Sequence, residues 1–243
     1  MLQISVTTVF LQIHPRTCHC INKLLMENRE LLDSVAQYVT NLFNEDKNEH
    51  LPYHNWYHTK KVVGHCNEIA KHYLLDEKQQ LILQIAAWFH DVGHLFGGWK
   101  NHEALSVSMM QDFMDQNHPK AGEILIPIAQ CIMATKLPPE PSSLLDEIIC
   151  DADNYHFGTT AFTKTDPLVR KEMEEHSGMQ ISEWCVTSLS LLRKHKFFTT
   201  YCQEKLSYGK AMNIAWLEAK TKRLLPTIEL HDNPELSYKE QNL

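Results

Sequence analysis

Residues 81–94 read LILQIAAWFHDVGH and join an apolar helix to two side chains that can bind a metal. The pattern predicts a helix over 78–89, with Asp76 as its N-cap. This helix is apolar nearly all round near its end, so we expect it to be central and buried. A buried Asp is costly unless it is paired or bound to a cation. His90 and Asp91 therefore need partners from elsewhere in the chain.

Apolar periodicity predicts an all-α protein. Helical stripes recur through the chain, and no convincing strand alternation is found. The further predicted helices cover 26–43, 53–74, 102–114, 121–135, 144–155, 165–195 and 199–224. We expect one helical bundle over 26–225, built around the site of His90 and Asp91. Residues 1–25 are expected to form an extension with little structure, and 226–243 a polar tail.

Composition narrows the class of protein. The chain has 243 residues, of which 43% are hydrophobic and 22% charged, as in soluble globular proteins. The net charge of -7 does not favour duplex nucleic acid or anionic lipid, although a bound metal can still attract a small anion. No apolar run is long enough to span a membrane. The 7 Cys form no tight CxxC pair, so we expect reduced core thiols and a cytoplasmic location.

Two other stretches offer partners for His90 and Asp91. In PYHNWYH (52–58), His54 and His58 are four residues apart and would share a face of a helix, where both can reach one metal or one can face the substrate. Two partly exposed histidines at a helix start would give the same pattern. In IICDADNYHFG (148–158), Asp151 and Asp153 follow an apolar run, so at least one should point inward. A solvated turn remains the alternative.

Together these residues form the ordered pattern His…His-Asp…Asp, which resembles the HD-domain superfamily of metal-dependent phosphohydrolases. The family motif falls on His58, His90, Asp91 and Asp153 as metal ligands, with Asp153 matching the last acid of the family's stretch. PYHNWYH is similar to the YHN-x-x-H signature of cyclic-nucleotide phosphodiesterases in this superfamily. HDVGH and NHEALS are similar to their HDVDH and N-x-E-S-x-L, whereas DADNYHFG and FFTTY are closer to stand-alone HD hydrolases.

The resemblance also implies roles for further residues. His54 matches the general acid that protonates the leaving group, and Asp91 would bridge to a second metal if one is present. His94 and Glu103 match residues that orient metal-bound water. Gly93 replaces the second acid of HDVDH, and Met109 and Met110 replace a His-His pair. These departures leave a second metal and a strict cyclic-nucleotide assignment open.

The function expected from these features is hydrolysis of a phosphoester in a small, nucleotide-type substrate by metal-activated water. Mixed His and Asp ligands suit Mn, Mg, Fe, Co or Zn, with one metal expected. A nucleoside triphosphate or alarmone hydrolase on the same scaffold is one alternative, and a non-catalytic nucleotide-binding sensor is another. An oxygenase with two irons is a third, which Met109 and Met110 disfavour.

Candidate phosphate-binding cations are Lys61, Lys100, Lys136, Arg170 and Lys171, with Lys136 ranked first, and Trp99 is a candidate for stacking on a base.

Overall fold

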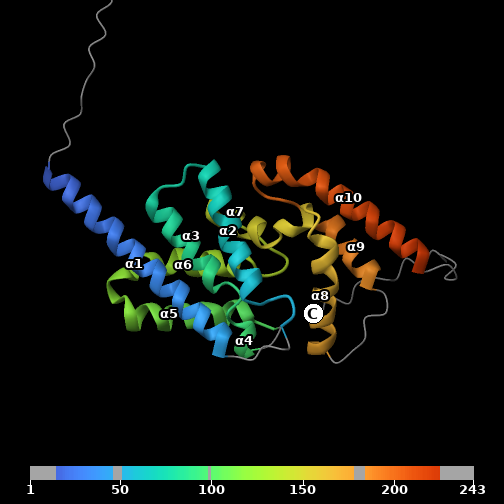
Figure 1. Cartoon of the computed structure of the whole chain (residues 1–243), viewed down its shortest axis with the longest axis horizontal. Coiled ribbons are helices and arrows are strands. Elements are labelled where there is room, and N and C mark those ends of the chain that lie inside the picture. The colour runs from blue at the N-terminus through green and yellow to red at the C-terminus, as the bar shows by residue number, and fades with distance from the viewer. Residues whose placement is uncertain (1–14, 46–50, 98–99, 178–183, 225–243) are drawn as a thin grey trace, which may run out of the picture.

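The computed structural model describes residues 15–45, 51–97, 100–177 and 184–224, and all regular structure in these ranges is helical (Figure 1). The elements in chain order are α1 (Pro15–Glu45), α2 (Trp56–His72), α3 (Glu77–Phe89), α4 (His94–Gly97), α5 (His102–Asn117), η1 (Pro119–Ala121), α6 (Gly122–Ala134), α7 (Leu144–Asp153), η2 (Tyr155–Gly158), α8 (Phe162–Ser177), α9 (Trp184–Lys194) and α10 (Thr200–Leu224). The predicted all-α fold is confirmed for these ranges. None of the described helices has the length and apolarity needed to cross a membrane.

Helix α3 is the central element of the fold, as its sequence predicts. It packs against α1, α2, α5, α6 and α7. Asp76 caps its first turn: the Asp76 carboxylate accepts the Gln79 N–H at 2.8 Å, and the Gln79 side chain accepts the Asp76 N–H at 3.0 Å. The side chains that follow are fully buried, namely Leu83, Ile85, Ala86, Ala87 and Phe89. The helix therefore ends deep in the interior, where His90 and Asp91 follow.

The C-terminal half differs from the prediction of one helix over 165–195. Helix α8 ends at Ser177 and α9 begins at Trp184, and residues 178–183 lie outside the described ranges. The Ser188 hydroxyl donates a hydrogen bond to Asp166, 22 residues earlier. Two residues that far apart in one straight helix would be separated by about 33 Å. The chain therefore folds back between α8 and α9.

Helix α10 rests directly on η2, the short segment that follows α7. A Cβ atom on Gly209 would overlap the backbone carbonyl of Gly158, so the close approach requires glycine. The Asn213 side-chain amide donates to the carbonyls of Phe157 and Thr159, both at 2.9 Å. These contacts fix the C-terminal helix on the end of the α2–α7 bundle.

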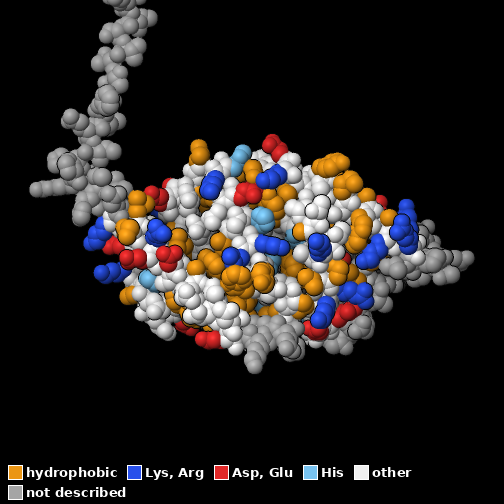
Figure 2. Space-filling model, viewed as in Figure 1, with side chains coloured by type: hydrophobic (Ala, Val, Ile, Leu, Met, Phe, Trp, Pro, Cys, Tyr) orange, Lys and Arg blue, Asp and Glu red, His pale blue; other side chains and the backbone are white. Residues whose placement is uncertain are grey.

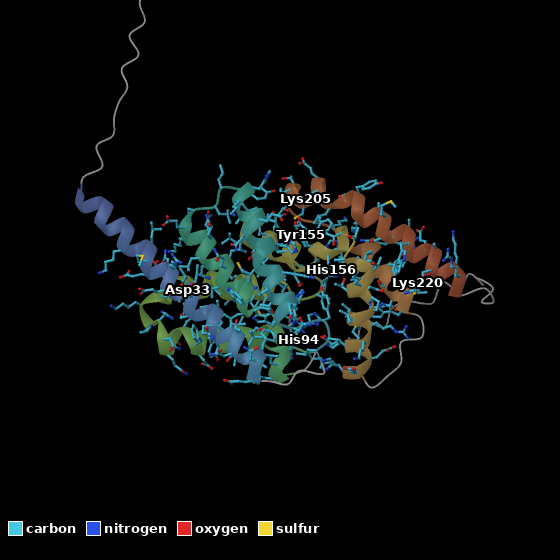
Figure 3. The ribbon with its side chains drawn as sticks, viewed as in Figure 1. Asp33, His94, Tyr155, His156, Lys205 and Lys220 are labelled. Carbon is cyan, nitrogen blue, oxygen red and sulfur yellow. The ribbon has the colours of Figure 1, made fainter. Side chains whose placement is uncertain are left out.

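A second contact joins α10 to α2 through one carboxylate. Glu68 Oε1 on α2 accepts hydrogen bonds from the Tyr155 hydroxyl at 2.6 Å, the Tyr201 hydroxyl at 2.8 Å and Lys205 Nζ at 2.9 Å. Tyr155 and Lys205 lie near each other in Figure 3, at the same side of the molecule. The interaction ties η2, α2 and α10 together.

Helix α1 is longer than the sequence predicted. Helix α1 begins at Pro15, whereas the apolar stripe predicted a start at Met26. The rest of the predicted extension and the predicted tail, 1–14 and 226–243, lie outside the described ranges.

Five cysteines are buried and free, as predicted for core thiols: Cys66, Cys131, Cys150, Cys185 and Cys202. Burial raises the pKa of the Cys202 thiol to about 12, so this thiol stays protonated at neutral pH.

Candidate metal centre

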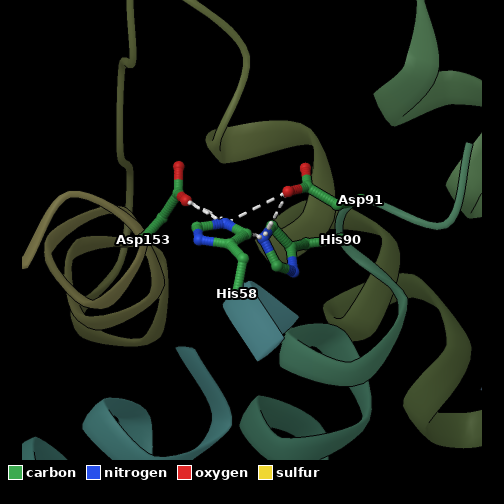
Figure 4. A group of neighbouring side chains, drawn as sticks. All are labelled: His58, His90, Asp91 and Asp153. Carbon is green, nitrogen blue, oxygen red and sulfur yellow. Dashed lines mark hydrogen bonds and ion pairs between the residues drawn. The ribbon is translucent and has the colours of Figure 1, made fainter. Parts of the chain in front are cut away.

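Three helices bring His58, His90, Asp91 and Asp153 together (Figure 4). His58 lies in the first turn of α2, His90 and Asp91 follow α3, and Asp153 is the last residue of α7. Each offers one ligand atom, and these atoms all lie within 4.8 Å of one another. The side chains of His90 and Asp91 are buried, whereas that of Asp153 is 22% exposed. The group is therefore open to solvent on the side of Asp153.

The spacing of these atoms fits a metal ion. His58 Nε2 lies 3.0 Å from Asp153 Oδ1 and 3.2 Å from Asp91 Oδ2. His90 Nε2 lies 3.1 Å from Asp91 Oδ2 and 3.4 Å from His58 Nε2. Bond lengths of about 2.1 Å to a tetrahedral or octahedral metal place neighbouring ligand atoms about 3.0–3.4 Å apart. Two imidazole nitrogens and two carboxylate oxygens at these distances match the shell of a divalent cation.

The carboxylate of Asp91 provides a further test of whether the group fits a metal ion. Its Oδ2 is buried, and within the described part of the chain it accepts no hydrogen bond. Two imidazole nitrogens lie within 3.2 Å of it without forming a hydrogen bond, so a cation held between these atoms would supply the missing partner. Burial raises the pKa of the Asp91 carboxyl, but the nearby His90 and His54 lower it more, to well below its usual range. An ionised, buried carboxylate of this kind is suited to a cation.

The ring of His90 is oriented by backbone contacts. Its Nδ1 is hydrogen-bonded to the carbonyl of Ala87 at 2.9 Å, which leaves Nε2 facing the group. The Ser106 hydroxyl donates to the His90 carbonyl at 2.9 Å and accepts the Gly93 N–H at 2.8 Å. Ser106 belongs to NHEALS, so this stretch holds the turn that carries the two ligands.

Asp151 and Asp153 are separated by their partners. Asp151 accepts the N–H of Phe198 at 2.8 Å, the N–H of Thr199 at 2.8 Å and the Thr199 hydroxyl at 2.6 Å. It therefore caps the start of α10, and only Asp153 reaches the histidines. The alternative of two solvated carboxylates is wrong, because Asp151 has no exposed surface.

His54 lies at the site, but it does not share a helix face with His58 as the four-residue spacing predicted. Helix α2 begins only at Trp56, because the Asn55 side chain caps it by accepting the N–H groups of Tyr57 at 2.9 Å and His58 at 3.2 Å. His54 precedes that cap, so His54 and His58 do not share a helix face. Their rings nevertheless lie 5.6 Å apart between centroids.

Glu172 on α8 holds His54 in place. Its side chain has no exposed surface, and its Oε2 accepts the N–H groups of Tyr53 at 2.9 Å and His54 at 3.0 Å. Its Oε1 is hydrogen-bonded to His54 Nδ1. Burial lowers the pKa of His54, but Asp91 and then Glu172 raise it more, so the net shift is upward. Nε2 is the second nitrogen of the His54 ring. Glu172, which fixes this ring, lies 118 residues later in the chain.

His94 and Glu103 are both buried. His94 Nε2 lies 3.9 Å from Asp91 Oδ1, and Glu103 Oε1 lies 3.4 Å from His102 Nε2. The rings of His54 and His94 are stacked with centroids 4.4 Å apart, and those of His94 and His102 with centroids 3.7 Å apart. His54, Asp91 and His94 form a second set of atoms that lie within 4.8 Å of one another. Burial lowers the pKa of His94 to about 2, so its ring is neutral.

Packing explains the two departures from the phosphodiesterase pattern. A Cβ atom on Gly93 would overlap the backbone carbonyl of His102, so no acid fits at this position. Met110 is fully buried in the core and Met109 packs against it. The positions of the missing ligands are therefore filled by the N-terminal end of α5 and by apolar packing.

The predicted phosphate-binding cations lie on the surface. Lys61, Lys100, Lys136 and Lys171 are exposed, and Arg170 is paired with Glu174 at 3.0 Å. Trp99 lies outside the described residues.

Sequence reasoning missed His102, Tyr53 and Glu172. His102 Nε2 lies 3.7 Å from Asp91 Oδ1, and the Tyr53 ring lies 4.7 Å from that of His58. Both residues stand in motifs already singled out, NHEALS and PYHNWYH. Glu172 lies in a polar stretch of α8 with no motif, so nothing in the sequence marked it.

Residues 55–158 match the family model described as HD domain. The matched range contains all four residues of the metal-binding group and ends before α8. Comparison with curated proteins and with solved structures finds no match.

Proposed function

We propose that this chain, which contains an HD domain and belongs to the HD phosphohydrolase superfamily, cleaves a phosphoester of a nucleotide-type substrate. The HD domain together with its buried His/Asp group supports a metal-dependent phosphohydrolase. The observation that supports the finer proposal is the position of His54, which Glu172 holds beside Asp91 and His94. The similarity of PYHNWYH to the phosphodiesterase signature supports a nucleotide-type substrate.

His58, His90, Asp91 and Asp153 would hold the metal. A divalent ion bound there supplies a water nucleophile at neutral pH and neutralises charge on the phosphoryl oxygens. The donor set suits Mn, Mg, Fe, Co or Zn, and it contains no thiolate. His94, which lies 3.9 Å from Asp91, and buried Glu103 are proposed to orient water in the site.

His54 is proposed to donate a proton to the leaving oxygen as the phosphorus–oxygen bond breaks. Glu172 fixes the proton on Nδ1 and orients the ring, so that Nε2 carries the transferred proton. A positioned general acid contributes about 100-fold or more to the rate. Tyr53 helps to build this arrangement, because its N–H shares Glu172 Oε2 with that of His54.

The test is a panel of nucleotides incubated with the full chain and each candidate metal, with the released product identified. A nucleoside monophosphate formed from a cyclic nucleotide, or a nucleoside and inorganic phosphate formed from a monophosphate, indicates the proposed phosphoester cleavage. Release of a nucleoside diphosphate, pyrophosphate or triphosphate indicates the alternative of triphosphate or alarmone hydrolysis. His54→Ala should abolish turnover while the metal content stays near that of the unaltered chain. Binding of nucleotides without cleavage of any would reject the enzyme and favour the sensor.

A further inference from the structure

The surface built by residues 191–224 differs in charge from the rest of the molecule. This segment holds eight Lys or Arg and two Asp or Glu, a formal charge of +6, whereas the whole chain carries -7. One of its two acids, Glu218, is paired with Arg193 at 2.6 Å. Lys and Arg side chains gather over the end of the molecule formed by α9 and α10 (Figure 2). This end of an acidic protein is therefore attractive to anions.

A cavity of about 390 Å³ opens within this basic region. Its walls are the segment that joins α9 to α10 and one stripe of α10. The lining residues are His195, Lys196, Phe197, Gln203, Ser207, Lys210, Ala211 and Ile214. No carboxylate lines it, and none of these residues belongs to the metal-binding group. Ligand pockets begin at about 300 Å³, so the space suits a small molecule.

The two lysines of the cavity can bind an anion. Lys196 is exposed and, within the described part of the chain, has no acidic partner. Lys210 Nζ donates to the carbonyl of His195 and retains two further N–H donors. The half-buried position of Lys210 lowers its pKa, as expected for an ammonium with no carboxylate beside it. An anion in the cavity would meet the ammonium groups of both lysines.

The wall of the cavity is fixed before any ligand binds. Gln203 Nε2 donates to the carbonyls of Phe197 at 2.9 Å and Phe198 at 3.1 Å. The N–H groups of Phe198 and Thr199 are bound to buried Asp151. Phe197 is itself buried and supplies an apolar floor together with Ile214. A rigid wall of this kind reduces the entropy lost when a ligand binds.

We propose that this cavity is a second phosphate site, separate from the metal centre, for a phosphorylated small molecule of mononucleotide size. Lys196 and Lys210 bind the phosphate, and Phe197 and Ile214 contact the organic part. A single hollow of this volume favours a mononucleotide over a nucleic-acid strand, which would use the whole basic face.

The experiment measures AMP binding by calorimetry to the full chain carrying Asp153→Asn, which removes a candidate metal ligand and changes none of the residues that line the cavity. AMP should still bind in this background. Lys196→Glu should weaken binding about tenfold or more, because a charge-assisted contact to phosphate is lost. Lys220→Glu, the same change on α10 but outside the cavity, should alter affinity less than twofold. Lys210→Gln, with circular dichroism to check folding, should weaken AMP as Lys196→Glu does.

Three results would overturn the proposal. The first is no AMP binding in the Asp153→Asn background, which assigns all binding to the metal centre. The second is an equal loss for Lys196→Glu and Lys220→Glu, which indicates a diffuse basic face. The third is an oligonucleotide whose affinity rises with length and depends on Lys220 as much as on Lys196. Because turnover is not measured, failure of the proposed hydrolysis would not affect this test.

Discussion

On α7, Asp151 and Asp153 have different partners although only Ala152 separates them. Asp151 is enclosed by the N–H groups and hydroxyl that begin α10, and Asp153 faces two imidazoles. Asp151 therefore stabilises the fold, whereas Asp153, two residues later, completes the candidate metal-binding group.

Replacing each aspartate by asparagine should separate these roles. Asp153→Asn removes a charged ligand, so metal content measured by mass spectrometry should fall well below one per chain. Asp151→Asn should retain the metal but lower the free energy of unfolding by about 1–3 kcal/mol, because three donors lose a charged acceptor. Equal metal loss in both variants would contradict this assignment.

Glu172→Gln should lower kcat about 100-fold or more, because the amide keeps an acceptor for the backbone but no longer provides a charged partner for His54. KM and metal content should stay near their original values, which distinguishes positioning from a general loss of structure. Glu175→Gln, an exposed change on the same helix, is the matched control and should leave kcat unchanged. A full-activity Glu172→Gln enzyme would remove Glu172 from the mechanism.

The residues that the sequence made visible are those in dense local patterns. His58, His90, Asp91 and Asp153 each stand beside apolar runs or other ligand-type side chains, and the structure brings them together. Glu172 has no such setting, since its importance comes from a contact with His54 across 118 residues. Only a folded chain reveals a partner of that kind.

At the scale of elements, the contact between the His90–His94 turn and the start of α5 limits what the site can hold. Gly93 lies against the backbone of His102, and Ser106 bridges the same two segments. The close approach brings the His102 ring to Asp91 and excludes a carboxylate at 93. The glycine is thus part of the packing of the site.

Gly93→Ala should therefore lower the free energy of unfolding by about 2 kcal/mol or more, because the added methyl group displaces the His102 backbone. Gly64→Ala is the control. Gly64 lies within α2 with nothing near its would-be Cβ, so alanine should stabilise the protein by about 0.5–1 kcal/mol. Chemical denaturation of both variants measures the difference, and changes of the same sign would contradict the packing argument.

Periodicity predicted the presence of most helices but not where chain direction changes. Helices α8 and α9 have the same 3.6-residue pattern, so 165–195 resembled one helix. The hydrogen bond between Ser188 and Asp166 shows the reversal. The predicted start of α2 at residue 53 also differs from the observed start at Trp56. Asn55 caps the helix there, but the apolar pattern continues on both sides of Asn55 and does not mark the cap.

At the scale of the whole molecule, the partly buried, neutral ring of His195 makes stability depend on pH. Burial, followed by the nearby Lys210, lowers the pKa of His195 to about 3. In the unfolded chain a histidine titrates near about 6.5. Between these values the unfolded chain binds more protons than the folded one, so the free energy of unfolding falls as the pH drops from about 6.5 towards 3.

His195→Phe keeps an aromatic ring against Phe157 and Phe197 and removes the titrating group. The difference in the free energy of unfolding between pH 7 and pH 5 should shrink by about 2 kcal/mol in this variant. Urea unfolding in phosphate-free buffer at both pH values provides the measurement. An unchanged difference would show that His195 does not remain neutral in the folded protein.

The position of Glu172 on α8 also has an evolutionary consequence. The carboxylate that holds His54 lies beyond residues 55–158, the range by which the HD domain is identified. A single substitution at 172 would leave the H…HD…D pattern and the candidate metal ligands intact while removing the support of His54, the proposed acid. Descendants of such a chain would keep the family signature as metal-loaded binding proteins, and the residue at this position on α8 would distinguish them from enzymes.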